Sequence, residues 1–156
     1  MSDERRWWIA VVHGVNLDQL GRRDPNHYGS LTLDELEGQI STDARELGLE
    51  TSFFQSNHEG ALVEHLHSLR GNADAVLINP GAWTHYAWAI REALEIASLP
   101  ALEIHLSDVG RREPWRQVSV IEDLCFMKIA GRGAAGYRDA LEALREHLNE
   151  GGKADE

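Results

Sequence analysis

Two arginines and a tyrosine stand close together in residues 14–30, a polar segment that follows the first strongly apolar run. They are Arg22, Arg23 and Tyr28, and glycines and a proline lie among them. The segment is too long and too polar for a simple turn, so we expect a mobile lid that carries reactive groups. Two guanidinium groups beside one phenol favour tyrosinate, which is a rare base at neutral pH. The segment therefore predicts chemistry that begins with proton abstraction.

Three more polar side chains stand at or just beyond the ends of apolar runs: Asn16, Asn79 and His105. Open parallel sheets bind ligands beyond the carboxyl ends of their strands, so we expect these residues to converge on one edge. An Asn there can clamp a carboxylate or hydroxyl, and a His can act as a general acid because imidazole titrates near neutral pH. The backbone N–H groups of Leu106 and Ser107 would be free to hold an oxyanion or a carboxylate.

Each of these motifs also has a structural interpretation, and the sequence leaves both open. Asn79 reads equally as the start of an Asx-turn before a helix cap, and His105 as a satisfied core histidine. The segment 55–60 reads as a helix cap with an acidic first turn. His85, near the start of a helix, either caps it or binds a ligand hydroxyl.

Apolar runs alternate with amphipathic stretches along the chain. The runs predict five strands, at Trp7–Val12, Thr51–Gln55, Ala75–Asn79, Ala101–Leu106 and Leu124–Ala130. The amphipathic stretches predict four helices, at about 32–47, 60–69, 86–97 and 134–149, and the first opens with the capping-box spacing of Thr32 and Glu35. This alternation predicts an α/β fold, a flavodoxin-like doubly wound five-stranded parallel sheet in a single three-layer domain. We assign residues 1–150 to that domain and residues 151–156 to a disordered tail.

The composition is that of an ordinary soluble domain, with 156 residues, 42% of them hydrophobic and 26% charged. No apolar run approaches the roughly 18 residues that cross a bilayer, and we find no signal peptide before the first strand. The single cysteine, Cys125, cannot form an internal disulfide, so we expect a cytoplasmic protein. Because Leu124 and Phe126 flank Cys125, we expect it in a buried strand as inert packing.

A net charge of −11 argues against nucleic acid or an anionic membrane as a partner. Arginines nevertheless gather in two short segments, as Arg22, Arg23, Arg111, Arg112 and Arg116. This clustering predicts a small anionic ligand, and the alternative is a set of solvated surface arginines paired with nearby acids.

Neither a metal nor a cofactor is expected. The eight histidines lack metal-ligand spacing, and His65 and His67 fall on different faces of a helix. The glycine pattern of residues 131–136 follows the last strand rather than the first, so we interpret it as a turn that leads into a helix, not a dinucleotide site.

Taken together, these motifs resemble the type II 3-dehydroquinate dehydratases. The matching segments are GVNLDQLGRRDPNHYGS, FQSNHEG, INPGAWTH, IREAL, EIHLSDVGRREPWR and the final GxGxxGY, in the family's order over about residues 7 to 145. The resemblance implies a flavodoxin-like fold, trimers that assemble into a dodecamer, and no cofactor or metal. It also implies the anti elimination of water from 3-dehydroquinate through an enolate, a step of the shikimate or quinate pathways.

By this resemblance, Tyr28 is the base that removes a proton from the carbon beside the ketone. Arg23 and Arg112 favour its tyrosinate form, and Asn16 positions a water that stabilises the enolate oxygen. A free phenol has a pKa of about 10, so lowering it by two or three units requires roughly 3–4 kcal/mol of differential stabilisation. Two guanidinium groups in a site that excludes water can supply a stabilisation of that size.

The resemblance further implies that His105 protonates the departing hydroxyl, with Glu103 as its partner. The remaining matched positions bind the substrate: Asn79, Leu106 and Ser107 for the carboxylate, His85 and Arg116 for ring hydroxyls, and Glu92 reaching a neighbouring subunit's site.

Some positions depart from the family pattern, among them Val15 in place of a proline, Asp108, Gly110 and Trp83. They motivate two alternatives: a specialised dehydratase acting on a related substrate such as an amino analogue, and a non-catalytic homologue that kept the pocket. A flavodoxin-like FMN carrier is a weaker alternative, because the first loop lacks a Ser/Thr-rich phosphate cradle.

Overall fold

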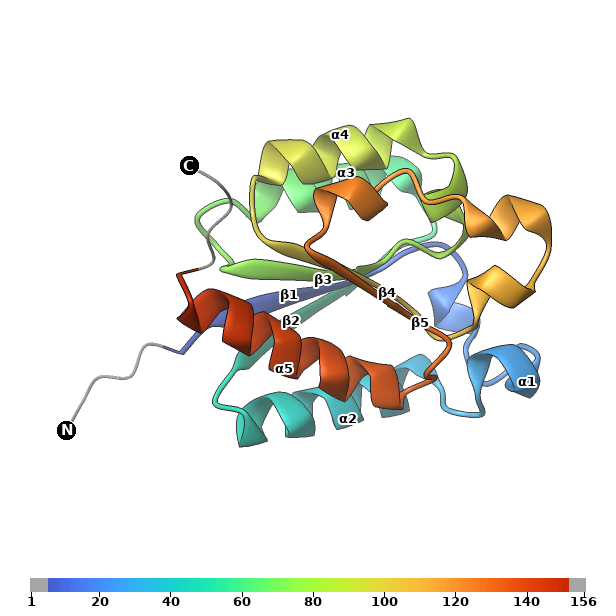
Figure 1. The fold of residues 1–156 in the computed structure, drawn as a ribbon, viewed down its shortest axis with the longest axis horizontal. Coiled ribbons are helices and arrows are strands. Elements are labelled where there is room, and N and C mark those ends of the chain that lie inside the picture. Colours follow the sequence, from blue (N-terminus) through green and yellow to red (C-terminus); the bar gives the residue numbers. More distant parts are fainter. Residues whose placement is uncertain (1–5, 152–156) are drawn as a thin grey trace.

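Five parallel strands form one sheet in the order β2-β1-β3-β4-β5 in a computed structural model that describes residues 6–151 (Figure 1). The strands are β1 (Trp8–His13), β2 (Glu50–Gln55), β3 (Ala75–Asn79), β4 (Ala101–His105) and β5 (Met127–Ala130). This is the strand order of flavodoxin-like folds, so the predicted fold class is confirmed.

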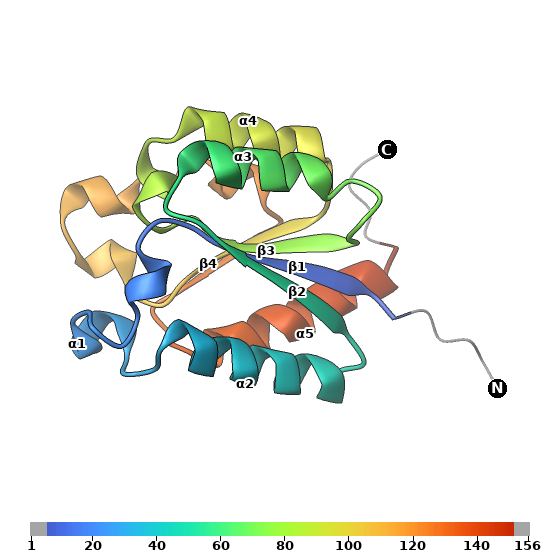
Figure 2. The ribbon, with the colours of Figure 1, turned by 180° about the vertical axis from the view of Figure 1, so that it is seen from behind.

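Helices cover both faces of the sheet. The helices α2 (Leu33–Glu46) and α5 (Ala135–Asn149) lie on one face, and α3 (Glu59–Ser68) and α4 (Trp88–Ala97) lie on the other (Figures 1 and 2). A short helix, α1 (Pro25–Tyr28), and five 3-10 turns occupy the connections, at Leu17–Gln19, Gly81–His85, Val109–Arg111, Pro114–Gln117 and Glu122–Leu124. No helix within residues 6–151 is long and apolar enough to cross a membrane.

The central strands are apolar because both of their faces are covered. Every residue of β3 and β4 is buried, and in β1 only Trp8 is exposed. Successive residues of β1 face opposite layers, since Val11 packs in the cluster that includes α2 and α5 and Val12 in the cluster that includes α3 and α4. By this alternation, His13 points toward α2.

The predicted start of α2 is confirmed in detail. The Thr32 hydroxyl accepts a hydrogen bond from the Glu35 N–H at 3.2 Å, and the Glu35 carboxylate accepts one from the Thr32 N–H at 3.1 Å. This reciprocal pair satisfies two backbone donors that a helix end otherwise leaves unpaired.

One predicted strand begins too early. The 3-10 turn Glu122–Leu124 occupies its expected start, and β5 begins only at Met127. Cys125 therefore lies in a partly buried connection rather than in a strand. Burial raises the pKa of its thiol to about 12, which agrees with the expectation of an inert side chain.

Two further segments are described in more detail by the structure. Residues 14–30, for which a mobile lid is predicted, contain a 3-10 turn and α1. The helix expected from residue 86 begins at Trp88, because the preceding residues, Gly81–His85, form a 3-10 turn. The glycine pattern at 131–136 is a turn into α5 as expected, with Gly131 and Gly133 at φ values of 79° and 57°.

The carboxyl ends of the strands carry the connections that bring distant segments together. Both views place α1 beside residues 109–117 at this end of the sheet (Figures 1 and 2). At the opposite end, Trp7 Nε1 donates a hydrogen bond to Asn149 Oδ1 at 2.9 Å and joins the start of β1 to the end of α5. The tail expected at 151–156 lies outside the described residues, apart from Gly151.

Candidate active site

Tyr28 is the meeting point of two arginines from distant parts of the chain. Arg23 Nη2 donates a hydrogen bond to the Tyr28 hydroxyl oxygen at 2.7 Å, and Arg112 Nη1 donates another at 2.6 Å. The guanidinium carbon of Arg23 also lies 3.7 Å from the centre of the tyrosine ring. Two cationic donors on one oxygen suit a phenolate, which accepts both bonds and has no proton of its own to place.

The local sequence explains how Tyr28 is presented. Asp24 is the N-cap of α1, and its side chain accepts a hydrogen bond from the Asn26 N–H at 3.0 Å. Pro25 occupies the first helical position, where its missing N–H is no loss. One helical turn therefore separates Arg23 from Tyr28 and folds the two side chains onto each other.

Arg112 connects this centre to the end of β4. Its Nη1 also lies 3.3 Å from the Ser107 hydroxyl, and its side chain is only 10% exposed. Arg112 follows the 3-10 turn Val109–Arg111, so the connection after β4 delivers both Ser107 and Arg112 to the same place.

The second centre is a buried imidazole–carboxylate pair on β4. His105 Nε2 lies 2.5 Å from Glu103 Oε2, and the Glu103 side chain is completely buried. The Thr84 hydroxyl donates to Glu103 Oε2 at 2.6 Å, and the Ser119 hydroxyl donates to Oε1 at 2.7 Å. Burial by itself raises the pKa of the Glu103 carboxyl, but the hydrogen bond and charge of His105 and the two hydroxyl donors outweigh it and lower the pKa. Glu103 is therefore an anion with both oxygens satisfied.

His85 lies beside a second arginine. Its Nδ1 is 2.6 Å from the carbonyl oxygen of Val118, and its ring contacts Trp115 edge-on with centres 5.2 Å apart. Burial lowers the pKa of His85, and the charges of His105 and Arg116 lower it further. These effects outweigh the hydrogen bond to the Val118 carbonyl oxygen, which raises the pKa. The ring is thus neutral at pH 7, with its proton on Nδ1 and Nε2 left to accept from a ligand hydroxyl.

Arg116 is held on the same 3-10 turn as Trp115. Its Nε donates to Glu113 Oε2 at 2.7 Å, and its guanidinium carbon lies 4.1 Å from the Trp115 ring centre. This leaves the terminal nitrogens of Arg116 as donors for a ligand.

Asn79 forms the Asx-turn that the sequence left as one of its two interpretations. Its Oδ1 accepts a hydrogen bond from the Gly81 N–H at 3.0 Å, and the residue is 5% exposed. Its side chain also faces the buried Tyr137 hydroxyl, and its Nδ2 carries two N–H donors, so the turn and a role in binding are compatible. Leu106 and Ser107 are buried directly after β4.

Asn16 has a left-handed backbone conformation, with φ of 68°. Its N–H donates a hydrogen bond to Asn57 Oδ1 at 2.8 Å. Among residues 6–151, its side-chain amide has no hydrogen-bond partner, and the residue is exposed. That amide is free to meet a ligand or a water.

Glu92 does not join the other site residues within the described chain. It lies on the exposed side of α4, one turn from Trp88 and one turn from Ile96, which are 64% and 55% exposed.

The chain is similar to known proteins over most of its length. The family model described as dehydroquinase class II matches residues 7–145. The chain belongs to this family. A 3-dehydroquinate dehydratase of Thermotoga neapolitana is 46% identical over 145 residues, which cover 93% of this chain and 99% of the relative. A "3-dehydroquinate dehydratase 2" of Pseudomonas putida is 45% identical over 142 residues, which cover 91% and 95%.

Solved structures agree. The type II dehydroquinase of Propionibacterium acnes superposes with a TM-score of 0.85 at 38% identity, over 89% of this chain and 96% of the other. The corresponding protein of Butyrivibrio crossotus gives a TM-score of 0.86 at 38% identity, over 89% and 97%. The family resemblance and the fold inferred from the sequence are therefore confirmed.

The sequence analysis did not identify the residues that hydrogen-bond to the candidate site residues and hold them in place. Thr84 and Ser119 bind Glu103, and Asn57 binds the turn of Asn16, yet none was singled out. The available signal was Glu103 itself, because a carboxylate inside an apolar strand requires polar partners. The sequence indicates that such partners exist without naming them.

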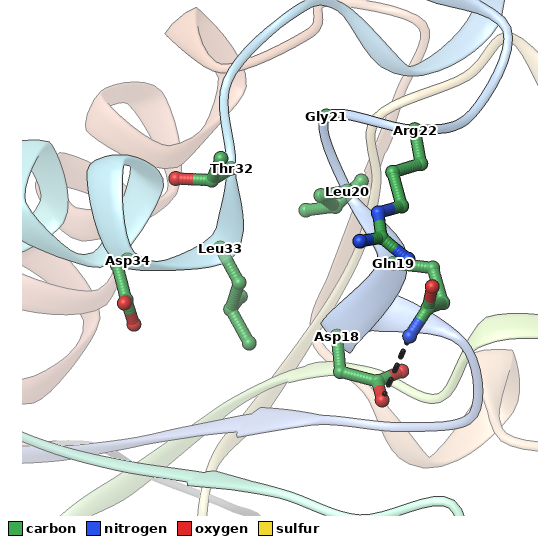
Figure 3. Close-up of a pocket in the computed structure, with 8 residues that line it drawn as sticks. All are labelled: Asp18, Gln19, Leu20, Gly21, Arg22, Thr32, Leu33 and Asp34. Carbon is green, nitrogen blue, oxygen red and sulfur yellow. Dashed lines mark hydrogen bonds between the residues drawn. The ribbon is translucent and has the colours of Figure 1, made fainter.

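One cavity lies beside the start of α2 and is not lined by the residues of the two reactive centres. This cavity of about 490 Å³ opens between the first connection and the start of α2, and Figure 3 shows Arg22 facing it across from Thr32 and Asp34. None of the predicted catalytic residues lines it. A smaller cavity of about 30 Å³ is lined by apolar side chains and by Tyr28, so the tyrosine has packing on one side and arginines on the other.

Proposed function

We propose that the chain is a 3-dehydroquinate dehydratase that eliminates water from 3-dehydroquinate through an enolate. The observation that carries this proposal is the convergence of Arg23 and Arg112 on the Tyr28 oxygen. An elimination beside a ketone needs a base strong enough to remove a carbon-bound proton, and an arginine-held phenolate is such a base.

The reaction runs from Tyr28 to His105. The Tyr28 phenolate takes the proton from the carbon beside the ketone, and Arg23 and Arg112 remain bonded to its oxygen. The side chain of Asn16 positions the water that stabilises the enolate oxygen. Collapse of the enolate breaks the carbon–oxygen bond, and His105 protonates the departing hydroxyl as water.

The pairing of His105 with Glu103 determines which ring nitrogen acts. Nε2 faces the Glu103 carboxylate at 2.5 Å, so Nδ1 is the nitrogen that can reach a substrate. The ionised carboxylate fixes the ring and stabilises the imidazolium from which the proton leaves. The proton that Tyr28 acquires must then return to solvent or to His105 before the next turnover.

Binding of the substrate draws on the remaining predicted residues. Asn79, Leu106 and Ser107 hold the carboxylate, and His85 and Arg116 hold ring hydroxyls. Arg23 and Arg112 add positive charge to this end of the sheet, which suits an anionic substrate even though the chain carries a net charge of −11.

We also propose that the chain works as an oligomer, with trimers assembled into a dodecamer and Glu92 reaching a neighbouring subunit. Trp88 and Ile96 support this, because they leave a large apolar area beside Glu92 in the single chain. Light scattering after size-exclusion chromatography measures the mass directly, and a monomeric, fully active protein would contradict the proposal. The cytoplasmic location stays a prediction.

The test of the function is the absorbance of the conjugated enone product after purified protein is mixed with 3-dehydroquinate. We expect a rise that Tyr28→Phe abolishes without loss of thermal stability. Tyr86→Phe removes the same atom from an exposed tyrosine and serves as the control. No rise with wild-type protein would reject the function, whereas normal turnover in Tyr28→Phe would reject only the mechanism.

Three of the departures from the family pattern have defined places in the fold. Trp83 is buried in the core between the sheet and α3 and α4, and Val15 packs against that same core. Asp108 is exposed and pairs with Arg111 at 3.3 Å. None of these departures replaces a residue that we propose for the reaction, which favours 3-dehydroquinate itself as the substrate. A dehydratase specific for an amino analogue remains the alternative, and kcat/KM values on both substrates would separate the two.

A further inference from the structure

The turn that carries Asn16 is held in a conformation that side chains rarely adopt. Asn16 and Ser98 are the two non-glycine residues with positive φ within residues 6–151. Asparagine tolerates the left-handed region better than most residues, although the region is sparsely populated even for asparagine. The hydrogen bonds around Asn16 stabilise this conformation.

The support comes from the connection between β2 and α3, about forty residues away. Asn57 Oδ1 accepts the Asn16 N–H at 2.8 Å, and Asn57 Nδ2 donates to Asp18 Oδ2 at 3.0 Å. One side chain thus holds the turn on both sides of its left-handed residue. Gln55 reinforces it, since its Nε2 lies 3.2 Å from both Asn57 Oδ1 and the Gly14 carbonyl oxygen.

Asn57 is not needed to cap the helix that follows it. The N-cap of α3 is His58, which makes no side-chain capping bond, and the His58 N–H donates to the Ser56 hydroxyl at 2.9 Å. The expected helix-capping role of this segment therefore does not account for Asn57. The two ends of its amide bind Asn16, the N-cap of the 3-10 segment Leu17–Gln19, and Asp18 within that segment.

We propose that Asn57 is a positioning residue of the elimination, which fixes the Asn16 amide where it addresses the enolate oxygen through water. The inference rests on the proposed function, because it assigns Asn57 a part in the same reaction. Asn57 acts through the backbone of Asn16 and touches no substrate. A variant that lacks the Asn57 amide still contains the Asn16 side chain, but that side chain is no longer held in position. Displacement of a catalytic group by about 1 Å can lower a rate about a hundredfold.

An exchange of donor and acceptor tests this directly. Asn57→Asp keeps an acceptor for the Asn16 N–H, but it removes the donor to Asp18 and sets two carboxylates against each other. Adding Asp18→Asn restores the bond in the reverse direction, because the new amide donates to the new carboxylate. Asn72→Asp makes the same chemical change before β3, at the opposite end of the sheet, and is the matched control.

We expect kcat to fall about ten- to hundredfold in Asn57→Asp with KM within about twofold of wild type, since Asn16 acts on charge that develops in the transition state. The double variant should regain most of kcat, and the control should match wild type. An unchanged kcat in Asn57→Asp, or a double variant no faster than the single one, would overturn the proposal. So would a parallel loss of kcat, substrate affinity by calorimetry and melting temperature, which marks a purely structural role.

These outcomes are distinct from failure of the proposed function. If wild-type protein binds 3-dehydroquinate but does not turn it over, the function fails before any variant is compared. If wild type turns over normally and the exchange has no effect, only the role of Asn57 is rejected.

Discussion

Replacing Glu103 with glutamine removes one negative charge from the protein interior and almost no volume. The glutamine amide can still accept from the Thr84 hydroxyl and can donate to the Ser119 oxygen, so the connections around it keep their partners. What is lost is the anion that faces His105 Nε2 at 2.5 Å. The variant therefore isolates the charge from the shape of the site.

The magnitude follows from the contact. A hydrogen bond to a charged group contributes about 1.5–3 kcal/mol, and this one is short and excluded from water. We propose that the Glu103 carboxylate stabilises the His105 imidazolium that protonates the leaving hydroxyl. Loss of that stabilisation should lower kcat about ten- to hundredfold, since about 1.4 kcal/mol corresponds to a factor of ten. KM should change little, because the Glu103 side chain is completely buried.

Stability should respond to pH with a defined sign. The folded protein holds the pKa of Glu103 below its ordinary value of 4.5, so the folded state binds fewer protons than the unfolded state near that pH. The contribution is thus present above about pH 4.5 and is lost as pH falls through the folded pKa. The difference in unfolding free energy between wild type and Glu103→Gln should shrink in acid.

The assay is enone absorbance under saturating substrate, together with urea unfolding at pH 7 and at pH 4. Glu64→Gln changes an exposed carboxylate on α3 in the same way and controls for net charge. A Glu103→Gln enzyme with kcat within twofold of wild type would refute the reasoning that the buried carboxylate supports His105.

Three further predictions concern Ser119, Gly14 and Cys125. Ser119→Ala removes one donor to Glu103 and should lower unfolding free energy by about 1–2 kcal/mol, measured by urea, with a smaller loss of kcat than Glu103→Gln. Gly14→Ala should destabilise by about 1–3 kcal/mol, because the new Cβ would lie 2.1 Å from the Pro80 carbonyl oxygen, and an unchanged urea midpoint would contradict this. Cys125, whose pKa is raised to about 12, should react with a thiol reagent at pH 8 far more slowly in folded than in unfolded protein; equal rates would show an accessible thiolate.

The regular elements were predictable where one physical signal dominated. Continuous apolar runs located β3 and β4 because both faces are covered, and the Thr32–Glu35 spacing located the start of α2. The prediction of a strand from Leu124 was wrong at its start, because apolar composition alone does not separate a strand from a partly buried connection. Phe126 in this run is exposed.

The reactive residue types of the candidate site were predictable, but the residues that hold them in place were not. Tyr28, Arg22 and Arg23 stood out because so many cationic and phenolic groups in one loop are unusual. Thr84, Ser119 and Asn57 are common polar residues in turns, and what gives them a role is a partner 16 to 41 residues away. Such pairings depend on how the connections fold over one edge, which no local pattern encodes.

The bond between Trp7 and Asn149 makes the chain a candidate for circular permutation. It brings the start of the first strand and the end of the last helix together at the edge remote from Tyr28 and His105. A short linker there, with new termini opened at the exposed turn 71–72, would leave every connection of the reactive edge uncut. The order in which the strands leave the ribosome would change, while the groups that perform the elimination would keep their neighbours.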